Sequence, residues 1–582
     1  MEQRPNRLMV TLSIISIFLI LNSSYSMISL SYAAYMKAPQ SPIGPTVKDD
    51  KIVVEKVTDG LDIPTSMTFL GPNNILVTEK ETGKVMHIVD GQIQKEPVLD
   101  VAVANSIERG LLGIAISKQP DGKTYVFLSY TESGNDEDGS DVEDNVEPAG
   151  NRLYRYEYID GELKNPILLL DLTAEPENDR GEHNGGKIRI GPDNNVYFIV
   201  GEVGGHRTQA QNIEDGPMPN GLGGVLRITK DGDIVDPSNP IFGDESPLSL
   251  YYAMGIRNSF GIDFDPVTGN LWDTENGPTA GDEINMLYPG FNGGWALIQG
   301  NSKDDLIGTG ATSDDLVYFG KSSYAEPKLS WITPIGITAL KFLDSDKLGK
   351  KYQNNMFVGD INNGLLYRFI LGGNRSDLSF DNGYSGNTPL LTDKVVNDPK
   401  ENQPFVFGEG FGGITDIEVG PDGFLYVLSY TGSLFRIVPA SSSSSTASSG
   451  SIAESNPSSN IGTSSEEEEE GQQSELSDNE EEQSNTGNGN SVPVVIQGLS
   501  GDRSYSPNPI TIETGQTITW YNGDTISHSV TSGLDNGDDS GEEFDSKAII
   551  PNQSYSITFE DSGTYPYYCF YHPSMVGEVI VK

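Results

Sequence analysis

Over most of its length the chain alternates between short apolar runs and turns rich in proline, glycine and asparagine. Turns at residues 71–74, 191–194, 265–266 and 420–423 precede apolar runs at 75–77, 196–200, 271–272 and 424–428. Such runs predict short β-strands, because almost no stretch has the periodicity of a long amphipathic helix. Residues 50–439 share this pattern and favour a β-propeller, with a β-sandwich as the alternative. The turns are unevenly spaced, so their period gives no blade number.

Two further segments follow the predicted propeller. Residues 440–491 begin with a run of serines and carry consecutive glutamates at 466–470. Because this composition cannot bury a core, we predict a disordered, acidic linker that spans roughly 40 Å on average. Residues 492–582 again contain strand-like runs, at 494–496, 510–512, 517–520, 554–559 and 579–581. They predict a small β-sandwich, which makes the whole chain all-β.

Residues 1–34 have the arrangement of an export signal. Arg4 and Arg7 form a positively charged start, residues 8–21 are largely apolar, and Ser31-Tyr32-Ala33 offers a cleavage point. The apolar run is short for a membrane span, and an uncleaved anchor is the alternative. We therefore expect a secreted or extracytoplasmic protein, with anchoring at the outer face of the cytoplasmic membrane as the second form.

The chain is strongly acidic, with 84 Asp and Glu against 37 Lys and Arg and a formal net charge of −47. This charge argues against nucleic acid as a partner, because the protein would repel phosphate. Part of the excess lies in an insertion at residues 132–148, which is crowded with acids and glycine. We predict a surface loop there, with scattered calcium binding as the alternative, since no EF-hand spacing is present.

Cys569 is the only cysteine of the chain, so it cannot form an internal disulfide. His572 and Met575 follow it in a C-x2-H-x2-M spacing, and His528 comes from an earlier segment. Two imidazole nitrogens, a thiolate and a weak thioether form a set in which copper changes between Cu(II) and Cu(I) with little rearrangement. The alternative is a Cys/His pair in an ordinary core. We predict a copper site at these four residues.

The C-terminal segment resembles the cupredoxins, especially the plastocyanin/amicyanin type. The resemblance is carried by Trp520-Tyr521-Asn522, His528-Ser529-Val530, Phe544-Asp545-Ser546 and residues 563–569. It implies a type 1 copper electron carrier with His528, Cys569, His572 and Met575 as ligands. Only three of the five histidines would then remain, too few for the trinuclear cluster of a multicopper oxidase.

The densest polar region of the predicted propeller runs from residue 180 to 295. Glu182 and His183 precede a predicted strand, which places them in a loop on one face. A histidine beside an acid is a candidate general base, because its pKa lies near neutral pH and the acid can orient the ring. An ordinary surface loop is the alternative. The Gly277-Pro278 loop with Asp282 and Glu283 is rich in oxygen donors and predicts a calcium site.

This region resembles the glucose/sorbosone dehydrogenase family, the soluble quinoprotein aldose dehydrogenases. The resemblance spans residues 55–438 and implies a six-bladed propeller with pyrroloquinoline quinone (PQQ) held over calcium at the central mouth. The matching pieces are residues 108–113, Glu182-His183, Gly201-Glu202, Arg257-Asn258, Asn276-Gly277-Pro278, residues 282–285 and Asn292-Gly293-Gly294-Trp295.

The resemblance also implies a role for each site residue. His183 would take the proton from the anomeric hydroxyl while hydride passes to the quinone, and Glu182 would orient its ring. Arg257 would stabilise charge on the quinone oxygen, and the Gly277 and Pro278 carbonyls would hold the calcium. The other pocket residues that the resemblance implies are Glu108, Glu202, Asn258 and Asn276.

One departure from the family bears on the cofactor. PQQ carries three carboxylates, which family members hold with basic residues on the last two blades. The corresponding stretches here, 359–364 and 412–416, contain no lysine or arginine. Lys321, Lys328 and Arg368 are the alternative cations.

Together these features predict a secreted quinoprotein-type dehydrogenase that oxidises an aldose sugar or a related alcohol. Electrons would pass from PQQ to the type 1 copper of the same chain and then to an external redox partner. One alternative is a non-catalytic propeller that binds carbohydrate or protein and carries a copper electron-transfer module. A third reading is an enzyme with the same propeller but a different cofactor or substrate.

Overall fold

The structure is a computed structural model that describes two parts of the chain. It covers residues 44–440, apart from 177–180, 381–390 and 392, and residues 491–582, apart from 497–503, 524–527, 534–540, 542, 547–548, 550–552 and 570–571. The predicted export signal, 1–34, and residues 441–490 of the predicted linker lie outside the described residues. The chain divides into two compact units, Met1–Ser441 and Ser442–Lys582, which we describe separately.

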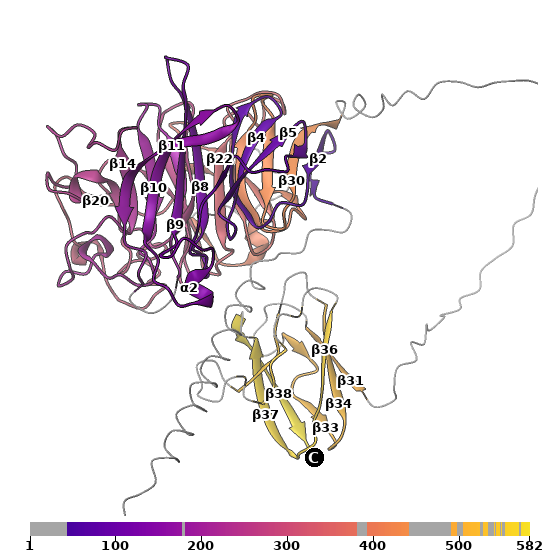
Figure 1. Ribbon diagram of the computed structural model, residues 1–582. Coiled ribbons are helices and arrows are strands. Elements are labelled where there is room, and N and C mark those ends of the chain that lie inside the picture. The colour runs from indigo at the N-terminus through magenta and orange to yellow at the C-terminus, as the bar shows by residue number, and fades with distance from the viewer. Residues whose placement is uncertain are drawn as a thin grey trace, which may run out of the picture. The chain divides into compact units, whose positions relative to one another are not determined.

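The first unit is built from antiparallel sheets whose first strands surround one axis (Figure 1). Among the described residues these first strands are β3 (Pro64–Gly71), β8 (Leu111–Lys118), β12 (Ile188–Ile190), β16 (Ser259–Phe264), β22 (Ile337–Phe342) and β28 (Ile414–Val419). Each contacts the next, and β28 contacts β3, so the ring is closed. The all-β propeller predicted from the sequence is confirmed, and the described residues of this unit form six sheets.

Each first strand begins a sheet that runs outward from the axis. The sheet of β3 also contains β4 (Asn74–Glu79), β5 (Lys84–Val89), β6 (Gln92–Ile93) and β7 (Leu99–Asp100). The sheet of β8 also contains β9 (Thr124–Glu132), β10 (Gly150–Ile159) and β11 (Glu162–Leu172). The sheet of β12 also contains β13 (Val196–Val200), β14 (Gly224–Ile228), β15 (Tyr251–Met254), β19 (Phe291–Asn292) and β20 (Ser323–Tyr324).

The other three sheets follow the same plan. The sheet of β16 also contains β17 (Leu271–Glu275), β18 (Asp282–Leu287), β21 (Leu329–Trp331) and β26 (Val395–Val396). The sheet of β22 also contains β23 (Met356–Asp360), β24 (Leu366–Leu371), β25 (Leu378–Ser379), β27 (Val406–Glu409) and β1 (Thr46–Val47). The sheet of β28 also contains β29 (Leu425–Ser429), β30 (Leu434–Pro439) and β2 (Ile52–Thr58). The short helices are α2 (Ser140–Glu143), η1 (Gln209–Gln211), η2 (Leu248–Leu250), η3 (Ser313–Asp315) and η4 (Pro399–Asn402).

The N-terminal strand closes the ring. β2 pairs antiparallel with β30, the last strand of the propeller, with Ile52 opposite Pro439 (Figure 1). The last sheet is therefore completed by residues from both ends of the unit. Removing β2 would expose the edge of β30, and removing β30 would expose the edges of β29 and β2.

Two of the turns that mark the strands share one construction. In the turn before β13, the Asp193 carboxylate accepts a hydrogen bond from the Tyr197 hydroxyl at 3.1 Å. In the turn before β29, Asp422 accepts one from Tyr426 at 3.0 Å. An aspartate at the turn and a tyrosine four residues later thus fix these two hairpins.

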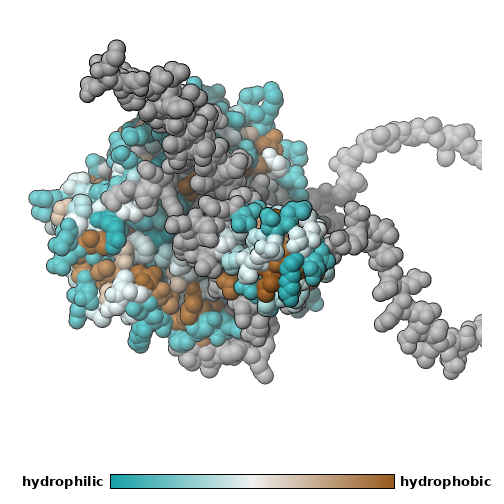
Figure 2. All heavy atoms as spheres, turned by 90° about the horizontal axis from the view of Figure 1, so that it is seen from below, coloured by the Kyte–Doolittle hydropathy of each residue, from teal (hydrophilic) through white to brown (hydrophobic). Residues whose placement is uncertain are grey.

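Loops at one end of the ring form what we call the mouth. They precede the first strands or join the second and third strands of a sheet, and they pack on one another around the axis. The Asn276 amide donates to Ile337 O at 2.7 Å, and a Cβ at Gly364 would lie 2.5 Å from Gly412 O. In the view of Figure 2, the coloured surface residues are mostly hydrophilic, with apolar residues in patches among them.

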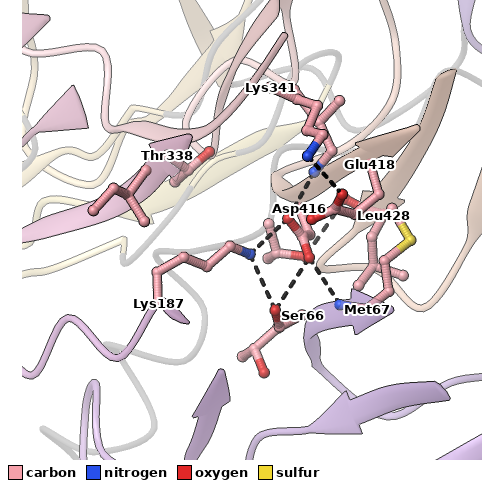
Figure 3. A network of polar contacts seen from close by, with 12 residues as sticks. Ser66, Met67, Lys187, Thr338, Lys341, Asp416, Glu418 and Leu428 are labelled. Carbon is pink, nitrogen blue, oxygen red and sulfur yellow. Dashed lines mark hydrogen bonds and ion pairs between the residues drawn. The ribbon is translucent and has the colours of Figure 1, made fainter. Parts of the chain in front are cut away.

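A buried network of charges fills the axis between the first strands (Figure 3). Lys187 lies 2.6 Å from the Asp416 carboxylate and donates to Ser66 Oγ at 3.1 Å. Deeper in the ring, Lys341 contacts Asp263 at 3.3 Å and Glu418 at 3.1 Å. Arg189 pairs with the same two carboxylates. Three cations thus face three anions from neighbouring strands.

The second unit is a β-sandwich, as the sequence predicts. One sheet contains β32 (Tyr505–Ser506), β31 (Ser491–Ile496), β34 (Thr517–Asn522) and β36 (Ser554–Thr558), and the other contains β33 (Ile510–Ile512), β38 (His572–Val581), β37 (Gly563–Cys569) and β35 (Thr531–Ser532). Trp520 is fully buried between them and packs edge-on against Tyr567 at 5.5 Å. Within the described residues, no helix is long and apolar enough to cross a membrane.

The axial network predicts a large stability loss when one partner is removed. Asp416→Asn would leave the buried Lys187 ammonium without its counter-charge, at a cost of about 3–5 kcal/mol. Urea unfolding of the full chain, followed by the fluorescence of the buried propeller residues Trp272 and Trp331, measures this loss. The double variant Lys187→Met/Asp416→Leu removes both charges and should lose much less. Equal losses in the single and double variants would contradict a role for charge pairing.

Candidate functional site

His183 lies at the mouth, in the loop that leads into β12. Its backbone has a φ of 61°, a left-handed conformation that is unfavourable for a residue with a side chain. Two contacts hold it there: His183 N donates to Glu108 Oε2 at 2.6 Å, and Gly201 packs so closely behind that a Cβ would lie 2.1 Å from His183 O. The strained backbone is therefore fixed by its surroundings, a common feature of functional residues.

The His183 ring is oriented by a carboxylate from another strand. His183 Nδ1 lies 2.5 Å from Glu202 Oε1, just beyond the end of β13, and both side chains are buried. Because an ionised carboxylate only accepts, Nδ1 carries the proton, and Nε2 is left with its lone pair. This arrangement leaves Nε2 able to take a proton from a substrate.

The structure corrects the orienting role that the resemblance gave to Glu182. Its carboxylate lies 4.0 Å from His183 Nε2, on the side of the ring where a substrate would bind. Glu202 is the residue that holds the ring. Sequence reasoning preferred Glu182 because it is adjacent in the chain, whereas the structure brings Glu202 to the ring from the following strand.

Arg257 lies beside this pair and is engaged by the neighbouring loop. Its backbone N donates to Glu275 Oε1 at 2.7 Å. Its Nη1 donates to Asn276 O at 3.0 Å and to Gly277 O at 3.1 Å. The guanidinium also lies 5.4 Å from the Trp295 ring centre, within cation–π range. Arg257 therefore shares the Gly277 carbonyl that the sequence assigned to calcium.

Glu108 and Asn258 complete the pocket wall. Asn258 Nδ2 donates to Glu108 Oε2 at 3.0 Å, while Asn258 Oδ1 is buried without a hydrogen-bond partner. The Asn276 side chain is turned into the protein, toward Ile337 O. The structure thus brings Glu108, Glu182, His183, Glu202, Arg257 and Asn258 together at the mouth.

The acidic insertion supports this wall, which the sequence did not predict. Asp141, in α2, is buried and pairs with Arg109 at 2.9 Å. It also accepts from the backbone N of Asn105 and Ser106, at 3.0 and 3.2 Å. These bonds fix the segment that carries Glu108. The only sequence signal was an insertion rich in acids, which by composition resembles any solvated loop.

The calcium ligand set expected from Gly277, Pro278, Asp282 and Glu283 is not assembled as one group. The Asp282 carboxylate accepts from backbone N–H groups of Gly277, Ile335 and Gly336 at 2.8–3.0 Å. Burial raises its pKa to about 6, against the opposing effect of these bonds. Glu283 accepts from the side chain of Gln299 at 3.0 Å and from Gly300 N. Among the described residues, no three His, Cys, Asp or Glu side chains form a metal-binding group.

In the second unit, three of the four predicted copper ligands have described side chains. His528, Cys569 and Met575 are all buried at 0% exposure. Cys569 Sγ lies 3.9 Å from His528 Nδ1. Bonds of about 2.0 Å and 2.3 Å, as for N and S ligands of zinc, at 120° would separate the two atoms by about 3.7 Å. The spacing therefore suits two ligands of one trigonal site.

The fourth copper ligand and the surroundings agree with this placement. His572 begins β38, and its backbone lies opposite Cys569 in the sheet register; its side chain lies outside the described residues. Ser529 N donates to Cys569 Sγ at 3.2 Å, a bond that would stabilise a thiolate. The Tyr505 hydroxyl in turn donates to Ser529 O at 2.6 Å, which fixes that donor.

The C-terminal unit matches a family of copper proteins. Residues 491–582 match the model described as Copper binding proteins, plastocyanin/azurin family. Amicyanin of Paracoccus versutus is 34% identical over 88 residues, which cover 15% of this chain and 64% of amicyanin. The expected cupredoxin domain is confirmed.

The propeller is similar to sugar dehydrogenases. Aldose sugar dehydrogenase YliI of Escherichia coli is 24% identical over 389 residues, covering 66% of this chain and 92% of that protein. Quinoprotein glucose dehydrogenase B of Acinetobacter calcoaceticus is 28% identical over 301 residues, covering 49% of this chain and 60% of that protein. The apo crystal structure of the soluble E. coli aldose sugar dehydrogenase shares the fold, with 23% identity, a TM-score of 0.50 and coverage of 67% of this chain and 99% of that one.

The family follows from the extent of the match. Residues 61–436, well over half of the chain, match the model described as Glucose / Sorbosone dehydrogenase. The match includes both partners of the His183–Glu202 pair. The chain belongs to the glucose/sorbosone dehydrogenase family and carries a cupredoxin domain at its C-terminus.

Proposed function

We propose that this chain is an oxidoreductase that oxidises an aldose sugar or a related alcohol at the mouth of its propeller. The electrons pass to a type 1 copper ion in its own cupredoxin domain and from there to an external redox partner. The observation that carries the proposal is the buried His183–Glu202 hydrogen bond, a base-and-orienter pair, on a chain that also contains the His528–Cys569 pair. The names of the relatives, an aldose sugar dehydrogenase and a quinoprotein glucose dehydrogenase, support this substrate class.

At the mouth, the chain's own residues would handle the proton of the substrate. His183 Nε2 takes the hydroxyl proton, and Glu202 stabilises the imidazolium that results. Glu182, 4.0 Å from Nε2, is placed to accept a hydrogen bond from a neighbouring sugar hydroxyl. Removal of the hydroxyl proton raises electron density on the carbon and makes loss of hydride from it easier.

In the cupredoxin domain, the proposed ligands are His528, Cys569, His572 and Met575. The side chains of His528, Cys569 and Met575 are buried. A fixed set of these ligand types lets copper accept one electron without a large change of geometry. Each oxidised sugar releases two electrons, so the copper must be reduced and drained twice for every turnover.

The proposed setting is outside the cytoplasm. The export-signal pattern of residues 1–34 supports it, with an uncleaved anchor at the outer face of the cytoplasmic membrane as the second form. A sugar substrate and a separate electron acceptor would both reach the protein there.

The family implies PQQ over calcium, and the charges of the residues at the mouth do not fit PQQ. PQQ brings three carboxylates, whereas three glutamates, Glu108, Glu182 and Glu202, lie beside His183. Arg257 is the neighbouring cation, and it already donates to the Gly277 carbonyl. No step is therefore routed through PQQ or calcium here.

The proton-transfer role predicts a sharp loss of activity in His183→Gln. Reduction of the chain's own copper by sugar, followed as bleaching of the blue absorbance, should slow by about 10²- to 10⁴-fold. Exogenous ascorbate should still bleach the copper at the normal rate, because the cupredoxin domain is untouched. Unchanged sugar-driven bleaching in this variant would remove His183 from the proton-transfer role, whereas the absence of sugar-driven bleaching in the wild-type chain would favour the non-catalytic, carbohydrate-binding alternative.

The copper site predicts a spectroscopic loss in Cys569→Ser. The variant should lose the blue thiolate-to-copper absorbance entirely, because serine supplies no thiolate. Its propeller should keep sugar oxidation when an artificial dye accepts the electrons. Retention of the blue band would remove Cys569 from the ligand set.

A further inference from the structure

We propose that the propeller accepts its electrons on a quinone of low negative charge that binds and leaves in each turnover, rather than on resident PQQ. This inference rests on the proposed sugar oxidation and specifies the carrier that the mouth can hold. The inference follows from the charges of the described residues at the mouth. The positive side chains there are paired with other groups of the protein, and the side chains around His183 are negative.

The first step is the charge next to the reacting nitrogen. Glu108 binds the backbone of His183, Glu202 binds its ring, and Glu182 lies 4.0 Å from Nε2. Glu275, which receives Arg257 N at 2.7 Å, is not counted with them, because burial raises its pKa well above the usual range. A ligand with three carboxylates would bring like charges close to Glu108, Glu182 and Glu202, which is unfavourable where water is partly excluded.

The second step is that the nearby cations already have partners. Lys80 is buried beside Glu108, donates to Asn105 O at 3.1 Å and lies 3.6 Å from Glu81. Arg109 pairs with Asp141. Lys187, four residues after His183, turns toward Asp416 and Ser66 (Figure 3). Each of these cations would have to leave a buried partner in order to reach a ligand carboxylate.

The other cations near the mouth do not change this balance. Arg257 can bind one ligand carboxylate with its remaining N–H groups. One guanidinium can form such a two-bond pair with only one of the three carboxylates of PQQ. Arg207 is exposed to water, where a charge pair contributes little. Of the alternative cations, Lys321 donates to Asn239, and Arg368 lies 5.3 Å from the Tyr352 ring centre. The third, Lys328, has a pKa that burial lowers and the charge of Asp377 raises.

The third step concerns the two mouth segments on the last two blades. They pack together at Gly364 and Gly412, and no lysine or arginine occurs within 359–364 or 412–416. The first segment instead contains Asp360, which accepts from Asn363 N at 2.6 Å and from the Tyr367 hydroxyl at 2.9 Å. This part of the mouth therefore provides no counter-charge for a ligand carboxylate.

The reaction balances with such a carrier. The anomeric C–H bond of the sugar breaks and its hydride passes to the quinone, while the hydroxyl proton passes to His183 Nε2. The sugar becomes a lactone, and the quinone, with one more proton, becomes a hydroquinone. The hydroquinone then reduces two Cu(II) in turn, one electron each, and releases two protons.

Equilibrium binding tests the proposal without any turnover. The full chain, loaded with copper only, is titrated with PQQ and with duroquinone, an uncharged quinone, and ligand retention is measured after desalting. We expect saturable duroquinone binding and no saturable PQQ binding below millimolar concentration, with neither ligand retained. PQQ binding at or below micromolar concentration, or PQQ retained after desalting, would overturn the proposal, whether or not calcium is added.

A gain-of-function pair tests the cause. Asn362→Lys and Thr415→Arg each add a cation to the segments that lack one, and Asn362→Gln and Thr415→Gln are the matched neutral controls. Each added cation should tighten PQQ binding by about 10- to 100-fold and leave duroquinone binding unchanged. An equal change for both quinones would indicate a structural effect, and no selective gain for PQQ would contradict the charge argument.

Sugar-dependent bleaching of the copper separates this inference from the proposed function. With duroquinone as carrier, glucose should bleach the blue band in the wild-type chain, and PQQ at equal concentration should not. If neither quinone supports bleaching while the binding preference holds, sugar oxidation fails but the charge selectivity stands. If PQQ alone supports bleaching, the charge selectivity fails and sugar oxidation stands.

Discussion

The first strands of the propeller converge on one axis, and the charges they carry there must be neutralised inside the protein. Lys187, Arg189 and Lys341 meet Asp263, Asp416 and Glu418 in a space without solvent. A buried charge without a partner costs several kcal/mol, so each of these strands depends on its neighbours to hold its ion pair. Burial lowers the pKa of Lys187, while the nearby Asp416 carboxylate raises it. The ring is therefore held by complementary charge as well as by apolar packing between blades.

The same constraint shapes the candidate site above the network. The loop that carries His183 leads directly into β12. Lys187, just before this strand, and Arg189, within it, pair with carboxylates on the axis. The cations nearest in sequence to the reacting histidine thus point away from the mouth, and glutamates surround it instead. The His183–Glu202 pair needed for acid–base chemistry is present. The cations that a polyanionic cofactor would require are instead paired with carboxylates of the axial network, where they stabilise the fold.

Much of the fold could be predicted from the sequence because its signals are local. Gly-Pro-Asp turns with a tyrosine four residues later fix hairpins by short-range hydrogen bonds, and the single cysteine with His572 and Met575 marks a copper loop. The role of Glu202 was missed because the contact joins two segments, and nearest-neighbour reasoning favours Glu182. The calcium site predicted from Gly277, Pro278, Asp282 and Glu283 stays a prediction. The sequence could not show that the Asp282 carboxylate accepts from backbone N–H groups, because a run of oxygen donors looks the same whether it faces a cation or such groups.

The pairing of β2 with β30 has a consequence for how the chain is arranged at a surface. Ile52 lies opposite Pro439, while β1, just before β2 in the chain, pairs with β27 on the neighbouring blade. The described chain therefore enters and leaves the propeller on two neighbouring blades. An uncleaved N-terminal anchor and the tether of the copper domain would then be attached to the same side of the ring. The length of the predicted linker, roughly 40 Å if it is disordered, would then largely set how far the copper could travel from the membrane.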